Sequence, residues 1–134
     1  MDIQLATLCD SAMDYNGKLC ILGTFDTIGS RALPVVHQNC VLAMRICFRS
    51  VDEGEHDLAI RIIDNDGQDA ITPLPAVKFT INIPQEVDFV TRNMIFHFQA
   101  LQFAKPGTYS LEISVDDDHL MSLPLRIVYL PQQG

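Results

Sequence analysis

A chain of 134 residues, of which 48% are hydrophobic and 19% charged, is long enough to bury a core and too apolar to be disordered. Its formal net charge of −8 and its nine scattered Lys and Arg residues argue against a protein that binds nucleic acid or anionic lipid through a basic surface. No apolar run is long enough to span a membrane as a helix. We therefore expect residues 1–134 to form a single domain without a nucleic-acid or membrane partner.

Apolar and polar residues alternate through most of the chain, which is the period of a β-strand and not of a helix. The predicted strands, in chain order, span residues 2–10, 18–26, 40–49, 56–64, 77–83, 91–101, 108–115 and 119–129. Turn residues separate them, most clearly Asn16-Gly17 and Asp66-Gly67. Close-set strands without a helical segment predict an all-β protein: an antiparallel, immunoglobulin-like β-sandwich of about eight strands with no substantial helix.

Two segments also resemble a known family. They are LCDSAMDYNGKLCILGTFDTI, residues 8–28, and PGTYSLEISVDDDHLMSLPLRIV, residues 106–128, with GEHDLAIRIIDNDG between them. They resemble an uncharacterised domain-of-unknown-function family of small bacterial proteins. The resemblance implies a small sandwich of bacterial origin with no assigned activity, and it transfers no site residues. The closing segment is also similar to many unrelated immunoglobulin-like modules.

The four cysteines, at positions 9, 20, 40 and 47, contain no CxxC pair, which argues against a zinc site. The opening MDIQLATLCD has an acid at position 2 and no basic segment, so it does not look like a secretory signal. We therefore expect a cytoplasmic protein whose cysteines are reduced. They are interpreted as small, buried or half-buried apolar residues.

Two acidic clusters could supply oxygen ligands to calcium. Asp64, Asp66 and Asp69 lie in one turn, whereas Asp116 and Asp118 lie in another. If loops 64–69 and 116–119 lay at the same end of the sandwich, their carboxylates could form a calcium site. The interpretation favoured here is simpler: both clusters are solvated hairpin turns, with no metal and no cofactor.

Residues that could act as catalysts form no recognised arrangement. The four histidines, at positions 37, 56, 97 and 119, show no metal-ligand spacing and no HExxH-like context. Cys9-Asp10-Ser11 is the only cluster that could hold a nucleophile, and nothing beside it resembles a nucleophile elbow or a Cys-His protease signature. We expect that the protein is not an enzyme, although the fold alone does not exclude one.

The N-terminal strands are apolar on both faces, unlike strand 108–115, whose outward residues are Ser and Glu. A sheet that is apolar on both faces must be covered on both. The cover could be loop 29–37, or it could be a second chain meeting an outer face formed around Leu8, Leu22, Val41 and Ala43. The leading hypothesis is a non-enzymatic cytosolic protein that acts through protein–protein contact, as a homodimer. The alternative is a calcium- or small-ligand-binding module that uses the acidic loops.

Overall fold

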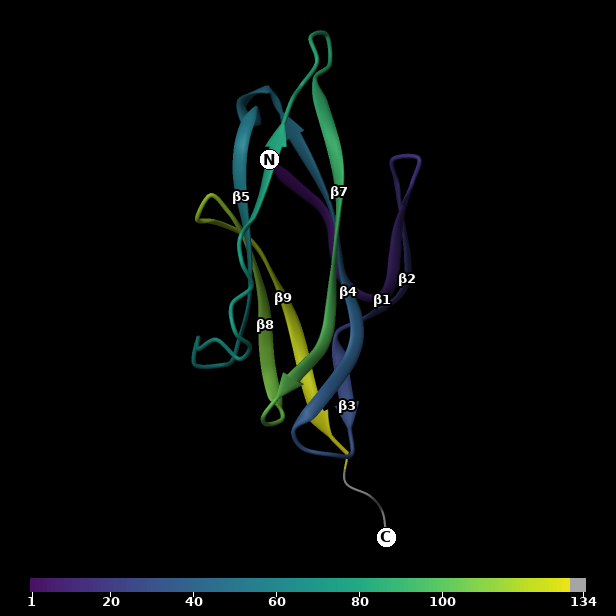
Figure 1. The fold of residues 1–134 in the computed structure, drawn as a ribbon, viewed down its shortest axis with the longest axis vertical. Helices are drawn as coiled ribbons and strands as arrows, with labels where there is room; N and C mark the ends of the chain where they lie inside the picture. Colours follow the sequence, from purple (N-terminus) through teal and green to yellow (C-terminus); the bar gives the residue numbers. More distant parts are fainter. Residues whose placement is uncertain (131–134) are drawn as a thin grey trace.

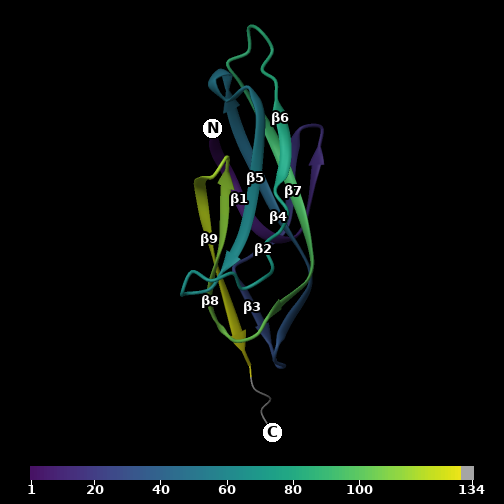
Figure 2. The ribbon, with the colours of Figure 1, turned by 60° about the vertical axis from the view of Figure 1, so that its left-hand side comes forward.

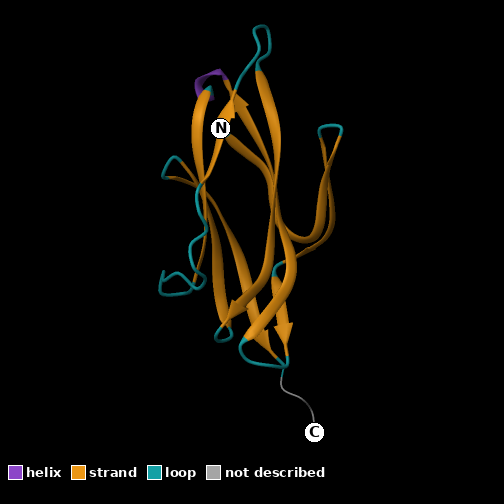
Figure 3. Ribbon diagram, viewed as in Figure 1, coloured by secondary structure: helices purple, strands orange, loops and turns teal. Residues whose placement is uncertain are grey.

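Nine strands form two facing sheets in the computed structural model, which describes residues 1–130 (Figure 1, Figure 3). The fold is therefore all-β. Within the described residues the one helical segment is the 3-10 turn η1, and no helix is long and apolar enough to cross a membrane. The elements are β1 (Asp2–Tyr15), β2 (Lys18–Phe25), β3 (Thr27–Ser30), β4 (Val35–Arg49), η1 (Ser50–Asp52), β5 (Gly54–Ile63), β6 (Val77–Ile81), β7 (Phe89–Phe103), β8 (Gly107–Val115) and β9 (Asp118–Tyr129).

The two sheets differ in the number and direction of their strands. The four-stranded sheet has the order β2-β1-β4-β7 and is antiparallel throughout. The five-stranded sheet has the order β3-β9-β8-β5-β6, and β3 pairs with β9 in parallel. Figure 2 brings this second sheet forward, with β9, β8, β5 and β6 side by side. The strand pairs are therefore antiparallel except at one edge, where β3 meets β9.

Strand β3 corrects the expected loop 29–37. Residues Thr27–Ser30 pair with β9, and β4 begins at Val35, so only residues 31–34 remain as a connecting loop. Ile28 is the one buried residue of β3. A four-residue segment with one apolar residue has too little periodicity to identify it as a strand.

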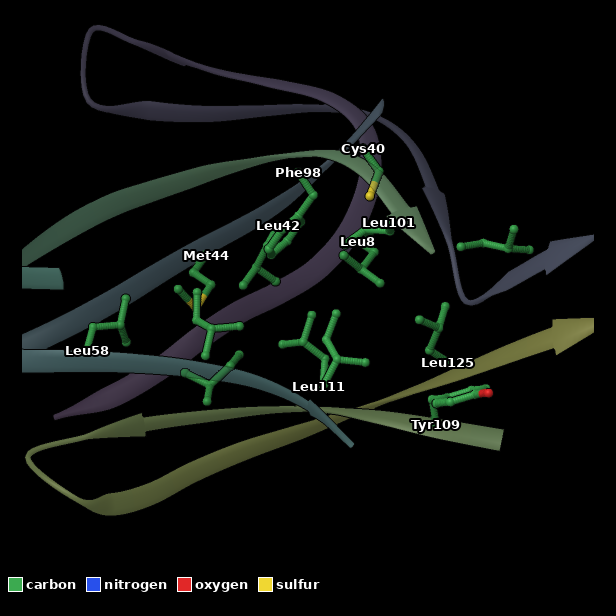
Figure 4. Packing of buried hydrophobic residues seen from close by; sticks show 14 of the residues in the cluster. Leu8, Cys40, Leu42, Met44, Leu58, Phe98, Leu101, Tyr109, Leu111 and Leu125 are labelled. Carbon is green, nitrogen blue, oxygen red and sulfur yellow. The ribbon is translucent and has the colours of Figure 1, made fainter. Parts of the chain in front are cut away.

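The main core lies between the sheets (Figure 4). From the four-stranded sheet, Leu8, Leu42 and Met44 point inward and meet Leu111 and Leu125 of the five-stranded sheet. All five are buried. Because burying one such aliphatic side chain contributes about 2 kcal/mol, this layer is the main source of stability of the fold.

The β1–β2 hairpin leaves the sheet and folds back over it. Strand β1 pairs with β4 only as far as Cys9, and beyond that residue it pairs with β2 alone. The bend lies at Asp10 and Gly23. Gly23 has φ of +72°, and a Cβ there would lie 2.5 Å from Oδ2 of Asp10. Beyond the bend, the hairpin runs alongside β4 and β7 without pairing with either strand (Figure 1).

Polar contacts hold the tip of this hairpin against the outer face of the sheet. Nη1 of Arg45 in β4 donates to the backbone oxygen of Gly17 at 2.9 Å. Nδ2 of Asn93 in β7 donates to Oδ2 of Asp14 at 2.8 Å. These hydrogen bonds connect residues far apart in the sequence, so they fix the angle at which the hairpin folds back.

A second, smaller apolar cluster lies beneath the hairpin. Cys9, Val41 and Ala43 are buried there, and hairpin residues Ala12, Leu19 and Ile21 pack against them together with Ile95 of β7. Among the described residues, the cover over this part of the apolar outer face is the chain's own first hairpin and not loop 29–37.

Candidate functional site

The four residues expected at an interface do not lie on one surface. Leu8 is 3% exposed and belongs to the main core, so its assignment to the outer face is wrong. Val41 and Ala43 do face outward but are buried beneath the hairpin. Only Leu22 remains available, with 70% of its surface exposed. Leu8 was misplaced because β1 is apolar on both faces and its register shifts between Ile3 and Leu5.

Leu22 belongs to an apolar, exposed face of the hairpin. Side chains of Met13 and Tyr15 from β1 lie on this face with Cys20 and Leu22 from β2, and all four residues are exposed. A shallow hollow of about 260 Å³ is lined by Ser11, Ala12, Met13, Cys20, Ile21 and Leu22. We call Ser11, Met13, Tyr15, Cys20 and Leu22 the hairpin surface. Apolar groups gathered in this way are typical of an interaction site.

The outer edge of β2 adds unpaired backbone groups to the hairpin surface. Strand β2 is the last strand of its sheet, and no strand among residues 1–130 pairs with its outer edge. Proteins commonly protect such an edge with charges, prolines or bulges. Between Lys18 and Phe25 the only charged residue is Lys18, and there is no proline. This edge is therefore suited to pairing with another extended chain.

The two acidic loops do not converge. In the β5–β8 pair, Ile63 lies opposite Ser110, and Leu58 lies opposite Val115. Loop 64–69 thus follows one end of the pair and the 116–118 turn follows the other, roughly 17 Å away at the usual rise per residue. Residues 1–130 contain no cluster of three or more His, Cys, Asp or Glu side chains that could hold a metal ion.

The acidic side chains have local partners instead. Oδ1 of Asp64 accepts the backbone N–H groups of Asp66 and Gln68, at 2.9 and 3.0 Å. Nε of Arg61 donates to Oδ1 of Asp69 at 2.9 Å. Asp66 is an exposed turn residue. In the other loop, Asp116 accepts the backbone N–H of Asp57, and Asp118 opens β9 opposite Val115. Each loop is organised as a turn.

A His-Ser-Glu cluster lies on the outer face of β8 and β9. Nε2 of His119 lies 2.8 Å from both Oε2 of Glu112 and Oγ of Ser122, and the Ser122 hydroxyl also contacts Glu112. Partial burial raises the pKa of Glu112, but hydrogen bonds from Ser122, His119 and Ser110 outweigh it and leave the pKa lowered. In a catalytic triad the acid and the nucleophile contact different ring nitrogens. Here one nitrogen contacts both, so the cluster is not a triad.

The second histidine cluster surrounds His56. Its Nδ1 lies 2.6 Å from Oδ2 of Asp116, and its Nε2 lies 2.5 Å from the backbone oxygen of Asp52. The ring stacks on Phe79 with centroids 5.4 Å apart. Sequence reasoning missed both histidine clusters. Asp116 is 60 residues from His56, and only strand pairing brings the two together.

All four cysteines are free thiols, and three of them are buried. Burial raises the pKa of Cys40 to about 11 and also raises the pKa of Cys9. Sγ of Cys9 donates to the backbone oxygen of Val41 at 3.6 Å. A buried, protonated thiol is a poor nucleophile, which argues against Cys9-Asp10-Ser11 as a catalytic cluster. Cys20 differs from the expectation of burial because it lies on the exposed hairpin surface.

Comparison with known proteins identifies a family. Residues 4–128 match a family of unknown function, DUF6941. The chain belongs to this family. The match covers every strand from β2 to β8 and most of β1 and β9, so the hairpin is part of the family domain. No curated protein matches the sequence. Since the family description assigns no activity, the function has to be inferred from the surfaces described above.

Proposed function

We propose that this member of the DUF6941 family is a non-enzymatic cytosolic protein that acts through protein–protein contact and self-associates through the hairpin surface. The observation that carries the proposal is the exposure of Leu22, at 70%, beside Met13 and Tyr15. One face of the hairpin already packs on Val41 and Ala43. The opposite face is also apolar but has no cover among the described residues. A second copy that supplies the cover would remove this face from water.

Backbone pairing supports a second copy as the partner. Two β2 strands from two copies can lie antiparallel along their outer edges, as in a symmetric dimer. This pairing would satisfy the unpaired backbone groups of both edges and bring the two Leu22 side chains to one apolar surface. A stable interface buries about 800 Å² and about 20–30 residues per partner, whereas the hairpin surface consists of five residues. We therefore expect a dimer of moderate affinity. Leu5 should contribute to it, because it is 42% exposed and lies opposite Arg45, which donates a hydrogen bond to the hairpin tip.

Light scattering of the eluting protein tests this proposal. We expect a mass of about 30 kDa at micromolar concentration, twice the 15.0 kDa of one chain. Leu22→Glu should shift the mass to that of a monomer because it places a charge in the apolar interface. Leu33→Glu, which changes a 50% exposed leucine outside the hairpin, should leave the dimer intact. A native monomer would refute self-association, and a dimer that survives Leu22→Glu would refute this interface.

We also infer that the sandwich has immunoglobulin-like connectivity, together with the bacterial origin that the family resemblance implies. Support comes from the way the strands are divided between the sheets, with the order β1-β4-β7 in one and β9-β8-β5-β6 in the other, as in that fold. Strand β3, which follows β1 and β2 in the chain but pairs with β9 of the other sheet, adds to this support. The hydroxyl of Tyr109 donates to the backbone oxygen of Lys105 at 2.6 Å. Such a tyrosine at the connection into this strand is a feature of immunoglobulin-like domains. Tyr109→Phe should lower the free energy of unfolding by about 1 kcal/mol.

A further inference from the structure

We propose that His56 is a proton-dependent clasp that ties η1, the connection between the two sheets, to the β8–β9 turn. The geometry of its two hydrogen bonds carries the proposal. Nδ1 faces the carboxylate of Asp116 at 2.6 Å, and Nε2 faces the backbone oxygen of Asp52 at 2.5 Å. A carbonyl oxygen and an ionised carboxylate only accept hydrogen bonds. Both ring nitrogens must therefore donate, which requires the doubly protonated imidazolium.

The surroundings hold the ring in this position. The His56 side chain is 11% exposed and stacks on Phe79, with an angle of 30° between the rings. Its partner Asp116 also accepts the backbone N–H of Asp57 at 2.8 Å. Asp116 and Asp117 adopt left-handed backbone conformations, with φ of +52° and +66°. Since such conformations are unfavourable for residues with a side chain, the hydrogen bonds to Asp116 help to stabilise the turn.

The charged groups around the ring favour the cation. The Asp52 carboxylate lies nearby, where it accepts the backbone N–H of Arg49 at 2.9 Å and lies 3.2 Å from the amino group of Met1. The hollow beside the ring is lined by Glu55, His56, Asp57, Lys78, Phe79 and Thr80. Lys78 is 4.0 Å from Asp57, which offsets part of that negative charge. Acidic groups therefore outnumber basic ones on the elements packed against His56.

The contacts of the ring shift the pKa values of both His56 and Asp116. The hydrogen bond to Asp116 is the largest influence that raises the pKa of His56, followed by the bond to the Asp52 backbone. The bond from His56 is also the largest influence that lowers the pKa of Asp116. A raised histidine pKa means that the stabilisation is complete below the ordinary value of 6.5 and is lost as the pH rises through the folded-state value. On the acid side, the clasp persists until the pH falls below 3.8.

Loss of the proton must open one of the two contacts. A neutral imidazole can donate from only one nitrogen, so the lone pair of the other nitrogen would face an oxygen lone pair at 2.5 or 2.6 Å. That arrangement is repulsive and cannot persist at such a distance. Either η1 or the 116–117 turn therefore moves away from the ring. The junction between the two sheets is closed while the ring is protonated, and it loosens as the pH rises through the folded-state pKa of His56.

Nuclear magnetic resonance of the native protein tests the protonation state directly. Nitrogen chemical shifts of His56, followed against pH, should show both ring nitrogens protonated on the acid side of a titration whose midpoint lies above the ordinary 6.5. A free histidine titrates at the ordinary value, so it serves as the reference. A midpoint at or below 6.5 would overturn the proposal.

Hydrogen exchange tests the loosening. We expect the protection factors of the Asp57 and Asp116 amides to fall several-fold as the pH rises from 6 to 9, because the stabilisation is lost as the pH passes the raised pKa of His56. His56→Gln, which cannot titrate, should abolish this pH dependence. His119→Gln, the matched control, removes a more exposed histidine that also contacts a carboxylate, and it should retain the dependence. Native protection factors that stay constant, or an equal loss in both variants, would refute the clasp. If His56→Gln fails to fold, the measurements on the native protein still decide.

Discussion

The outer faces of the two sheets differ in chemistry and in how they are covered. On the five-stranded sheet, β8 presents Ser110, Glu112 and Ser114 outward, as a face in contact with water requires. On the four-stranded sheet, β4 presents Val41 and Ala43, and both are buried beneath the β1–β2 hairpin. The difference shows that an apolar outer face does not by itself indicate a partner protein. The hairpin formed by neighbouring residues of the same chain can cover it, and the hairpin's own outer face then becomes the candidate interface.

An aspartate introduced on each of the two outer faces should give the largest difference in the free energy of unfolding. Ala43→Asp would bury an unpaired carboxylate beneath the hairpin, where Ala43 has no exposed surface. We expect the free energy of unfolding to fall by about 3 kcal/mol or more, measured by urea denaturation. Ser114→Asp on the five-stranded sheet should change it by only about 0.5 kcal/mol, because the side chain stays at the surface. Equal losses would contradict the contrast between the faces.

The bend of the hairpin offers the next test. Gly23→Ala adds a Cβ that meets the Asp10 carboxylate at a residue with φ of +72°. We expect a loss of about 2 kcal/mol in the free energy of unfolding, from backbone strain and steric contact together. Gly17→Ala is the control, since Gly17 has φ of +79° but no atom within 4 Å of the added Cβ. Its loss should be about 1 kcal/mol, from strain alone. If the two variants lose the same amount, contact with Asp10 does not set the bend.

The polar contacts at the hairpin tip should have a smaller effect. Asn93→Ala removes the hydrogen bond to Asp14, so amides of residues 10–22 should exchange roughly fivefold faster. The exposed Asn82, changed to Ala, serves as control and should leave these rates unaltered. Unchanged rates in Asn93→Ala would mean that apolar packing alone holds the hairpin.

Acid pH should weaken the same contact. The hydrogen bond from Asn93 is the largest influence lowering the pKa of Asp14 below 3.8, followed by the bond from the Gly17 backbone. Because the pKa of Asp14 is lowered in the folded state, its contribution to stability is present above pH 3.8 and is lost as the pH falls through the folded-state pKa. Exchange in residues 10–22 should therefore accelerate in acid in the native protein, and less so in Asn93→Ala. An identical pH dependence in both proteins would contradict this assignment.

The smallest expected effect concerns the acidic loops of the polar, five-stranded sheet. A calcium site of micromolar affinity would stabilise the fold by about 4 kcal/mol at millimolar calcium. Because the two loops lie at opposite ends of the β5–β8 pair, we expect no change in melting temperature on adding calcium. A rise of several degrees that a chelator reverses would show that one loop binds the ion on its own.

Alternation of apolar and polar residues was sufficient to predict eight of the nine strands, and the Asn-Gly pair itself predicted the turn at Asn16-Gly17. Both residues of that turn have positive φ, as a two-residue hairpin requires. The prediction failed where the periodic pattern was too short, at β3, or where both faces were apolar, at Leu8. With apolar residues at successive positions, a period of two cannot identify the inward face.

The sequence by itself determined the all-β class, the polar outer face of β8 and the need to cover the apolar outer face of β4, because each follows from residue types at local spacing. Only the tertiary structure decided what provides that cover, since the bend at Asp10 and Gly23 is a matter of backbone conformation and contact. It also decided that the acidic loops lie apart and that His56 meets Asp116. Contacts across a sheet depend on strand order and register, which join residues distant in the chain and leave no signal in local spacing.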